Sequence, residues 1–445
     1  MDTETADAAR RNPDTALRPV PEAGPDLLAR WQAGGGELVE LLAQVREQCG
    51  GVAAFRTGPA PTVLVTDPQA VQHVLAQHPD RYTKRSHRAR LLVGDGVLAA
   101  TGEEWKRQRR LLQSQFTGTG MRRYEHRITA AARATAARWQ EYARSGQTFD
   151  VGDEMRHYAL DAIWRALTGH PLDKRTAQEL TAVNAVAEVL PSLPADATRA
   201  RDAVAAELDR IDALAHRAIE AARSGTAGPE GPGLLHVLTD AAAAHPEYTD
   251  RLIRDEFVTL LAAGHETTAT TLTWLYLLLD WNPAAREQAL AAGGEGSAAR
   301  RQALQALVHE TLRLYPSAWL LPRHATQDDV VNGFAIEAGT DVLVCPYLTH
   351  RDPGLWPEPE RFDPRRFTTP GGRPAQQGAY YPFGLGPRTC VGLQFALKES
   401  VALLEHLLPA HTPVFSATPT GAVYGITVRP AGPAPATLAD AGPTS

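Results

Sequence analysis

A long segment without proline occupies the middle of the chain. From Asp250 to Asn282 there are 33 residues without a proline, and Pro283 follows as a stop. Apolar residues recur at three- and four-residue spacing, which predicts one α-helix of about 50 Å. Its apolar part, Phe257–Leu279, contains a glycine, a His-Glu pair and six threonines. Such polar content disfavours contact with lipid. We therefore expect a helix buried at the centre of a large helical core.

Outside this segment the pattern is mainly helical, with a minor β portion. Residues from about 103 to 282 carry helical periodicity. The runs Val52–Arg56 and Thr62–Thr66, separated by TGPAP, predict a hairpin. Asp67 followed by Pro68 predicts the start of a helix. Further short strands are expected at Asp328–Ala335, Asp341–Cys345 and Val423–Val428.

The composition is that of an ordinary globular protein, with 43% of the 445 residues hydrophobic and 22% charged. A net charge of −6 argues against a nucleic-acid binder. Cys49, Cys345 and Cys390 lie too far apart in the sequence to predict a disulfide framework or a Cys-x-x-Cys metal pair. They favour a reducing compartment. The N-terminal segment lacks the apolar run of a secretory signal or membrane anchor. We expect a cytoplasmic protein without a membrane span.

A glycine-rich loop surrounds the last cysteine. The run Phe383-Gly384-Leu385-Gly386-Pro387-Arg388-Thr389-Cys390-Val391-Gly392 places three glycines around one sulfur. Glycines let the backbone approach a bound group and aim N–H donors at a thiolate, which stabilises it as a metal ligand. The alternative is a free cysteine buried in a turn, and this is our interpretation of Cys49 and Cys345.

Three further motifs precede this loop. Ala263-Gly264-His265-Glu266-Thr267-Thr268 puts a carboxylate beside a hydroxyl, a possible proton relay or simply a polar helix face. Glu310 and Arg313 are spaced for an ion pair on one helix face, which is commonplace on surfaces. Trp105 and Arg109 share a helix face within a basic cluster, which alone could indicate a nucleic-acid patch.

In their order along the chain, the four motifs resemble those of the cytochrome P450 monooxygenases. The last run matches the family's haem-binding signature F-x-x-G-x-R-x-C-x-G at Phe383, Gly386, Arg388, Cys390 and Gly392. The resemblance implies a mainly α fold with a minor β portion, in which a long central helix lies over haem beside small β-sheets. Because the motifs must converge on one cofactor, we expect a single haem domain over residues 27–430. Residues 1–26 are expected to be a flexible arm and residues 431–445 a flexible tail. Length alone would suggest about three domains at roughly 150 residues each.

The resemblance also implies a role for each matched residue. Cys390 would be the axial ligand of the iron in haem b. Thr267 and Glu266 would deliver protons to bound oxygen, where the helix loosens. Residues that would contact the haem or its propionates are Trp105, Arg109, Ala263, Arg323, Phe383, Gly384, Gly386, Arg388 and Gly392.

A structural cluster and a substrate pocket are implied as well. Glu310 and Arg313 would be joined by Arg366 of Pro364-Arg365-Arg366-Phe367, although Arg365 and Arg361 make the third member ambiguous. The pocket should be mostly apolar. By family position it would include Leu92, Val93, Ala262, Trp319, Leu320, Leu321, Val423 and Tyr424, and ordinary core packing is the alternative for each.

The implied activity is that of an oxidoreductase that activates O2 and hydroxylates or epoxidises a lipophilic small molecule in secondary-metabolite biosynthesis. No flavin or iron–sulfur signature accompanies the motifs. Two electrons from NAD(P)H would therefore arrive through a separate ferredoxin reductase and ferredoxin. The candidates for docking an acidic ferredoxin are Lys106, Arg107, Arg110 and Lys398, which could equally be solvated side chains.

Other functions compete with this one. The same fold supports peroxide-driven oxidation, oxidative coupling and nitrogen-group transfer, and a haem sensor or carrier would keep Cys390 without the acid–alcohol pair. Zinc-protease chemistry is disfavoured. His265-Glu266 and His309-Glu310 both begin like H-E-x-x-H, but the fifth positions are Ala269 and Arg313.

Overall fold

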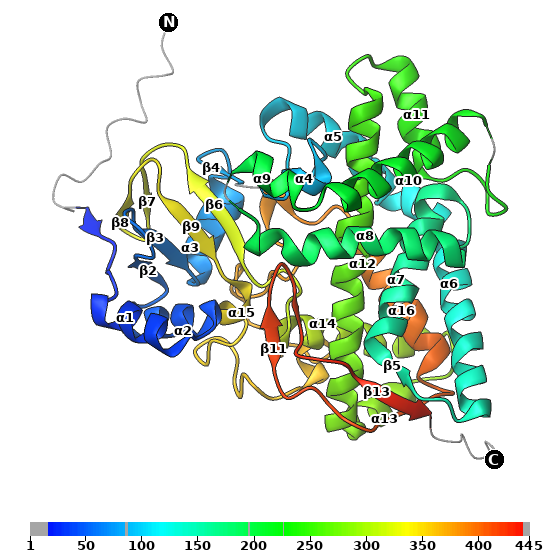
Figure 1. The fold of residues 1–445 in the computed structure, drawn as a ribbon. Coiled ribbons are helices and arrows are strands. Elements are labelled where there is room, and N and C mark those ends of the chain that lie inside the picture. The colour runs from blue at the N-terminus through cyan, green and yellow to red at the C-terminus, as the bar shows by residue number, and fades with distance from the viewer. Residues whose placement is uncertain (1–16, 85–87, 195, 226, 439–445) are drawn as a thin grey trace, which may run out of the picture.

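The computed structural model describes residues 17–84, 88–194, 196–225 and 227–438. Most of the helices fill one side of the molecule, and the other side holds the largest sheet together with the helices nearest the N-terminus (Figure 1). The α-helices are α1 (Pro25–Gly34), α2 (Leu38–Cys49), α3 (Pro68–Gln72), α4 (Arg90–Val93), α5 (Gly102–Gln115), α6 (Gly118–Ser145), α7 (Val151–Thr168), α8 (Lys174–Val189), α9 (Ala197–Asp202), α10 (Ala205–Arg223), α11 (Leu234–Ala244), α12 (Asp250–Trp281), α13 (Pro283–Ala291), α14 (Ala298–Leu314), α15 (Pro346–Thr349) and α16 (Leu393–Leu407).

The strands are short and, within the described part of the chain, form four small sheets. They are β1 (Arg18–Pro19), β2 (Val52–Phe55), β3 (Thr62–Val65), β4 (Tyr82–Thr83), β5 (Phe149–Asp150), β6 (Leu321–Ala325), β7 (Asp329–Val331), β8 (Phe334–Ile336), β9 (Asp341–Val344), β10 (Pro413–Phe415), β11 (Ala422–Tyr424), β12 (Val428–Pro430) and β13 (Pro435–Leu438). The largest sheet has the order β2-β3-β9-β6-β4, and β2 and β3 form the expected antiparallel hairpin. Asp67 caps α3 as expected, accepting the N–H groups of Gln69 and Ala70. Four short helical turns complete the set: η1 (His73–Gln77), η2 (Leu190–Ser192), η3 (Pro364–Phe367) and η4 (Gly386–Arg388).

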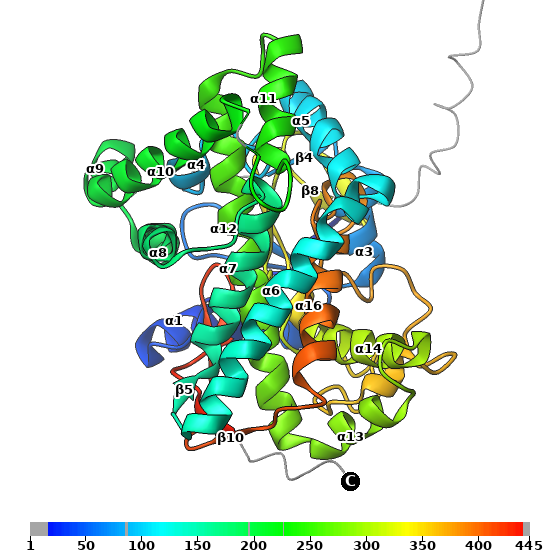
Figure 2. The same cartoon turned by 90° about the vertical axis from the view of Figure 1, so that its right-hand side faces the viewer.

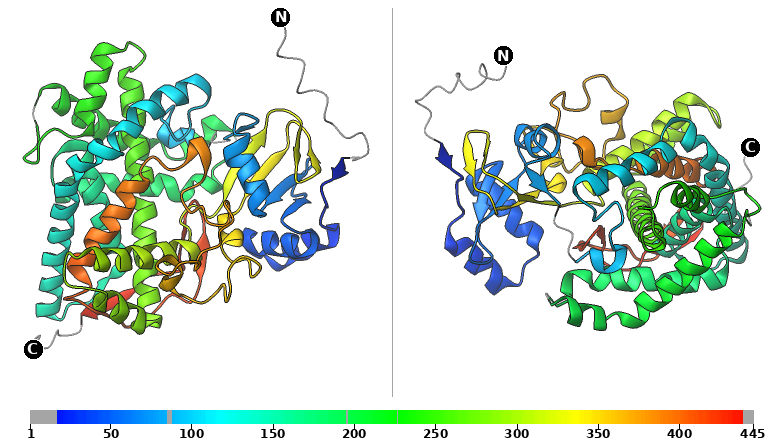
Figure 3. Two further views of the ribbon diagram at one scale, coloured as in Figure 1. Left: turned by 180° about the vertical axis from the view of Figure 1, so that it is seen from behind. Right: turned by 90° about the horizontal axis from the view of Figure 1, so that it is seen from above.

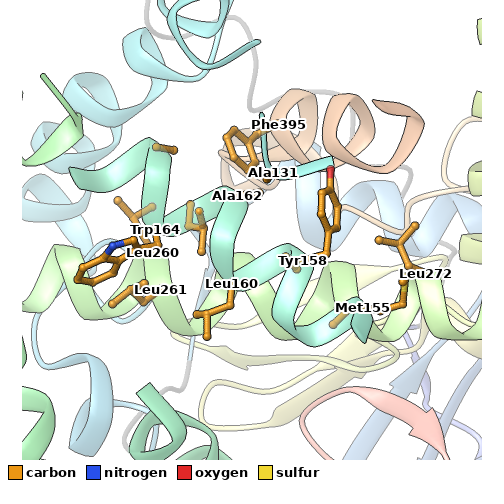
Figure 4. Close-up of a cluster of buried hydrophobic side chains, with 14 of the residues drawn as sticks. Ala131, Met155, Tyr158, Leu160, Ala162, Trp164, Leu260, Leu261, Leu272 and Phe395 are labelled. Carbon is orange, nitrogen blue, oxygen red and sulfur yellow. The ribbon is translucent and has the colours of Figure 1, made fainter. Parts of the chain in front are cut away.

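The central helix predicted from the proline-free segment is present as α12. It has 32 residues, Thr249 caps its first turn, and Pro283 begins the next helix. α7 packs along it, α6 packs against α7, and α16 packs against α6 (Figure 2). In the close-up of Figure 4, side chains of α7 such as Leu160 and Trp164 face Leu260 and Leu261 of α12. This contact is part of the main hydrophobic core. Among the described residues, no helix combines the length and the hydropathy needed to cross a membrane.

Two segments predicted as single strands are hairpins instead. Asp328–Ala335 contains β7 and β8, which turn at Asn332 and Gly333, both with positive φ. Asn-Gly is the preferred pair for such a turn, so the signal was present in the sequence. Val423–Val428 likewise falls across the antiparallel pair β11 and β12.

Parts of both segments that were expected to be flexible belong to the fold. Arg18–Pro19 pairs with β8, and α1 begins at Pro25, so residues 17–26 belong to the fold. Pro435–Leu438 forms β13, which lies between β10 and β5. Strand pairing uses backbone groups, so these proline-rich segments can take part despite a composition typical of loops. The rest of the predicted arm and tail, residues 1–16 and 439–445, lies outside the described residues.

Candidate active site

The cysteine loop is a tight turn that ends at α16. The Gly384 N–H donates to the carbonyl of Tyr381 at 2.9 Å, and the Cys390 N–H donates to that of Phe383 at 2.9 Å. Gly384 and Gly386 have φ values of 75° and 69°, a region that favours glycine. The sulfur lies 4.0 Å from where a Cβ on Gly392 would stand. The shape of the loop therefore requires glycine at 384 and 386, whereas Gly392, with φ of −88°, has space for a Cβ.

Gly386 is also fixed by a close neighbour. A Cβ at this position would lie 2.2 Å from the carbonyl oxygen of Leu75 and 2.7 Å from the Cα of Ala76. Both residues belong to η1, a π-helical turn that follows α3. Figure 3 shows this blue segment beside the orange chain that leads into α16. The cysteine loop is thus shaped by a segment more than 300 residues earlier in the chain.

Cys390 is accessible and yet surrounded by protein. The residue is exposed, yet burial raises the pKa of its thiol. We infer from these two facts that the side chain borders a hollow enclosed by protein. The Gly392 N–H, Arg109 and Lys84 oppose the effect of burial and favour the thiolate. Cys345, by contrast, is fully buried in a hydrophobic cluster, and burial raises its thiol pKa to about 12.

At the predicted motif, part of the surface of the central helix is not covered by other side chains. Most residues of α12 from Ile253 to Leu279 are buried, but Ala263 is exposed and Ala262, Gly264 and Thr267 are half-buried. The Thr267 hydroxyl donates to the Ala263 carbonyl at 2.9 Å. α12 is helical throughout, so the loosening that the resemblance implied is not seen. Gly264 has a packing reason, because a Cβ there would approach Ile163 of α7 to 3.0 Å.

Glu266 points to a different side of α12. Its carboxylate lies 3.7 Å from Arg156 of α7, at a cavity of about 370 Å³ that is also lined by Thr270 and Arg429. Burial raises the pKa of Glu266, and the guanidinium groups of Arg156 and Arg429 oppose this shift. Glu266 and Thr267 are therefore neighbours in the sequence whose side chains have different partners, an arginine for the first and a backbone carbonyl for the second.

The predicted arginines converge near Cys390. The guanidinium carbon of Arg388 lies 4.2 Å from the ring centroid of Trp105, and Arg388 donates to the Ala100 carbonyl at 2.9 Å. Burial lowers the pKa of Arg388 to about 10, with Arg109 adding to the shift. Burial lowers that of Arg323 to about 10 as well, with Arg388 adding to it. Like charges are therefore held together here.

Lys84 is a fourth cation that the motifs did not identify. Burial lowers its pKa to about 7, and Arg323 and Arg388 add to the shift. The strand that precedes it, β4, pairs with β6, the strand of Arg323. Within the described ranges, Lys84, Arg109, Arg323 and Arg388 form no ion pair with a carboxylate. We call these four residues the cation cluster.

The predicted structural ion cluster is assembled. Arg313 donates to both oxygens of Glu310 at 2.8 Å, and both side chains are fully buried. Arg366 lies 3.4 Å from the same carboxylate. Arg361 and Arg365 instead pair at the surface with Glu358 and Asp363. The ambiguity about the third member is therefore settled in favour of Arg366.

The predicted substrate residues lie in several environments. Leu92 and Val93 are buried in the main core, with Ala262 packed against it. Trp319 is buried in another cluster with Leu320 and Tyr424 at its edge, and its indole donates to the Gly425 carbonyl at 2.9 Å. Leu321 packs against the remaining cluster, and Val423 is half-buried in β11. Their role in a pocket stays a prediction.

The docking candidates divide into paired and unpaired residues. Lys106 pairs with Glu103 at 2.6 Å, and Lys398 pairs with Glu125. Arg107 and Arg110 are exposed on α5. The neighbouring helix α6 adds Arg122 and Arg123, which are exposed too and belong to none of the motifs.

The residues present fit a haem group. A cluster of cations without carboxylate partners requires an anionic ligand, and the two propionates of haem supply two negative charges. Cys390 lies within the influence of two of these cations, Lys84 and Arg109, which favour its thiolate, and Ala263 on α12 is not covered by other side chains. The donor set and its charge are therefore those of a haem–thiolate site.

Comparison with known proteins agrees with this geometry. The family model for cytochrome P450 matches residues 19–412. Cyclooctatin synthase of Streptomyces melanosporofaciens is 31% identical over 383 residues, which cover 80% of this chain and 81% of that protein. Cyclooctat-9-en-7-ol 5-monooxygenase of the same organism is 29% identical, with coverage of 80% and 81%.

Solved structures show the same fold. The crystal structure of the cytochrome P450DA heme domain has a TM-score of 0.82 at 24% identity, covering 96% of this chain and 99% of that one. A six-coordinated cytochrome P450 from Thermus thermophilus has a TM-score of 0.69 at 29% identity, covering 91% and 99%. In this family, proteins contain haem iron and act as oxidoreductases. The match of the family model over residues 19–412 shows that the chain belongs to the cytochrome P450 family.

Proposed function

We propose that this protein is a haem–thiolate monooxygenase that inserts oxygen into a lipophilic small molecule. The observation that carries the proposal is the cation cluster, two of whose members, Lys84 and Arg109, act on the thiol of Cys390. In this arrangement Cys390 holds the iron of haem b. Arg109, Arg323, Arg388 and Lys84 neutralise its propionates, and Trp105 holds Arg388 in place.

Each polar residue of the site then has a defined task. When bound, haem supplies an iron that activates O2, and a thiolate ligand favours cleavage of the O–O bond. The Thr267 hydroxyl donates a hydrogen bond to the Ala263 carbonyl. The lone pairs of its oxygen can therefore accept a hydrogen bond from a proton donor in the site. Burial raises the pKa of Glu266, which favours its protonated form, and the carboxyl lies at a cavity lined by Arg156. Glu266 is the proposed reservoir of protons for the site.

The substrate class is supported by the named relatives. One relative is named for the oxidation of cyclooctat-9-en-7-ol, and another for the synthesis of cyclooctatin. We infer a lipophilic substrate and a role in secondary-metabolite biosynthesis for this chain. The apolar residues predicted around the hollow suit such a molecule, because a lipophilic ligand gains free energy by leaving water.

Electrons come from NAD(P)H through a ferredoxin reductase and a ferredoxin. The exposed arginines of α5 and α6, Arg107, Arg110, Arg122 and Arg123, suit an acidic partner. Arg110→Glu should slow reduction by the ferredoxin, whereas Arg301→Glu, an exposed position on α14, should not. Reduction should also slow as ionic strength rises. Equal rates for both variants would contradict docking at this surface.

Turnover tests the monooxygenase activity directly. Metabolites that shift the spectrum of the ferric protein are incubated with O2, ferredoxin, reductase and NADPH, and products are analysed. Thr267→Ala should consume NADPH with most of the product lost. Thr273→Ala, which removes the same type of hydroxyl-to-carbonyl bond on the same helix, should keep product formation. Products formed only with peroxide, or none from any bound metabolite, would overturn the proposal.

A further inference from the structure

A buried carboxylate outside all the motifs ties together the segments that build the haem site. Asp329 begins β7, and its side chain is 1% exposed. It accepts hydrogen bonds from His73 Nε2 at 2.8 Å, from the Tyr82 hydroxyl at 2.7 Å and from the Val330 N–H at 2.8 Å. It also pairs with Arg81. A buried carboxylate with this many donors holds its surroundings in one arrangement.

Asp329 and its side-chain partners His73, Arg81 and Tyr82 are called the hub. Its first arm, the bond to His73, leads to the cysteine loop, residues 383–392. His73 is the first residue of η1, the π-helical turn. Such turns are rare and are frequent at functional sites. Leu75 and Ala76, two and three residues further along η1, are those against which Gly386 packs without space for a Cβ. Displacing the start of η1 would therefore move the backbone that shapes the loop before Cys390.

The second arm leads to the cation cluster. Tyr82 and Thr83 form β4, and the next residue is Lys84. β4 pairs with Ala325 and His324 of β6, and Arg323 is the residue just before His324 in that strand. Arg81, on the other side of Tyr82, accepts the Thr326 N–H at its carbonyl, at 2.8 Å. The hub thus fixes the strands that carry two of the four cations.

We propose that Asp329 is a positioning residue of the haem site. It acts through His73 and η1 on the thiolate loop, and through Arg81 and Tyr82 on Lys84 and Arg323. The inference rests on the proposed haem–thiolate site, and it adds a residue that touches neither haem nor substrate. It predicts that loss of the Asp329 charge alters haem ligation and haem retention beyond any loss of stability.

A matched control separates positioning from simple packing. Asp161 on α7 is also a buried carboxylate, 5% exposed, which accepts from Arg165 Nε at 2.9 Å and from the Leu172 N–H at 2.8 Å. None of its partners belongs to η1, β4, β6 or the cysteine loop. Asp329→Asn and Asp161→Asn therefore remove the same charge from similar surroundings.

The test compares these variants as holoproteins by three measurements: the share of ferrous–carbon monoxide absorption at about 450 nm, the rate of haem transfer to a haem-binding acceptor protein, and urea unfolding. Asp329→Asn should lose a large part of the band and transfer haem about tenfold faster, as loss of one hydrogen bond to a charged group predicts. Asp161→Asn should lower stability and leave both haem measurements unchanged within about twofold.

Two milder variants keep the test decisive if Asp329→Asn folds poorly. His73→Ala cuts the first arm and should diminish the band. Tyr82→Phe removes only the hydroxyl of the second arm and should speed haem transfer while keeping the band. If Asp329→Asn, or these two variants in its place, match Asp161→Asn in both haem measurements, the inference is wrong. A wild-type protein that lacks the band would instead contradict the proposed thiolate ligation.

Discussion

Thr268 donates a hydrogen bond of 2.6 Å to Glu399 inside the protein core. Thr268 follows Thr267 on α12, and Glu399 lies on α16, the helix that begins just after Cys390. The bond therefore joins the helices on the two sides of the proposed haem. Glu399 is fully buried, and its second oxygen has no hydrogen-bond partner. Burial raises the pKa of Glu399 well above its usual range, which favours the neutral carboxyl.

Glu399→Gln should therefore be tolerated. Glutamine keeps the acceptor for Thr268 and carries no charge. A carboxyl with a raised folded-state pKa contributes stability that is fully present below its unfolded value of about 4.3 and is lost as pH rises. The stability of the Gln variant relative to wild type should therefore increase between pH 5 and 9. Urea unfolding across this range tests the prediction, with Glu399→Ala as the contrast, expected to lose about 2–4 kcal/mol. A Gln variant that is less stable at every pH would contradict a neutral Glu399.

Lys84→Met should weaken haem retention. Methionine keeps the apolar length of the side chain and removes the charge that the cation cluster contributes. Transfer of haem to an acceptor should become about tenfold faster, the effect of losing one charge-assisted hydrogen bond. Lys174→Met, at an exposed position at the start of α8, is the control. Unchanged transfer in Lys84→Met would exclude this lysine from the propionate site.

Glu310→Gln should strongly destabilise the fold. It leaves Arg313 and Arg366 as buried charges without a full partner, which costs about 3–5 kcal/mol. Glu358→Gln breaks the exposed pair with Arg361 and should cost less than about 0.5 kcal/mol. Denaturant unfolding of the two variants gives the comparison. Similar losses of unfolding free energy in the two variants would contradict a larger contribution of the buried cluster to stability.

Acid should destabilise the protein well before its carboxylates titrate. Burial lowers the pKa of His265 and His309 to about 4 and that of His350 to about 3. A lowered histidine contributes stability that is present above its unfolded value of about 6.5 and is lost as pH falls. Between pH 7 and 5, the free energy of unfolding of His309→Gln should therefore fall by about 2 kcal/mol less than that of the wild type. Parallel losses in the two proteins would contradict a buried neutral imidazole at this position.

The sequence predicted the parts of the site that reside in contiguous motifs. The cysteine loop, Trp105, Arg388 and the central helix could be recognised because their chemistry requires particular residues at short spacing. Lys84 and Asp329 could not be recognised, because each is a lone charged residue without a motif. Lys84 is placed by the pairing of β4 with β6, and Asp329 is linked to the site by the bonds of its side chain to His73, Arg81 and Tyr82.

The ends of the chain illustrate the same limit. Proline-rich segments are typical of loops, yet Pro435–Leu438 forms a strand because a partner on each side accepts and donates backbone hydrogen bonds. The turn at Asn332-Gly333 is different, since the local signal was present and predicts the hairpin. Local chemistry was predictable, whereas long-range pairing was not.

The carbon monoxide spectrum of Cys390→Ala tests the central claim most directly. The reduced wild-type protein should absorb at about 450 nm, as haem with a thiolate ligand does. Cys345→Ala, which removes a buried thiol from a hydrophobic cluster, should keep that band. Cys390→Ala should lose it while the protein stays folded. A Cys390→Ala protein that retains the band would show that another residue holds the iron, and the account of this site would be wrong.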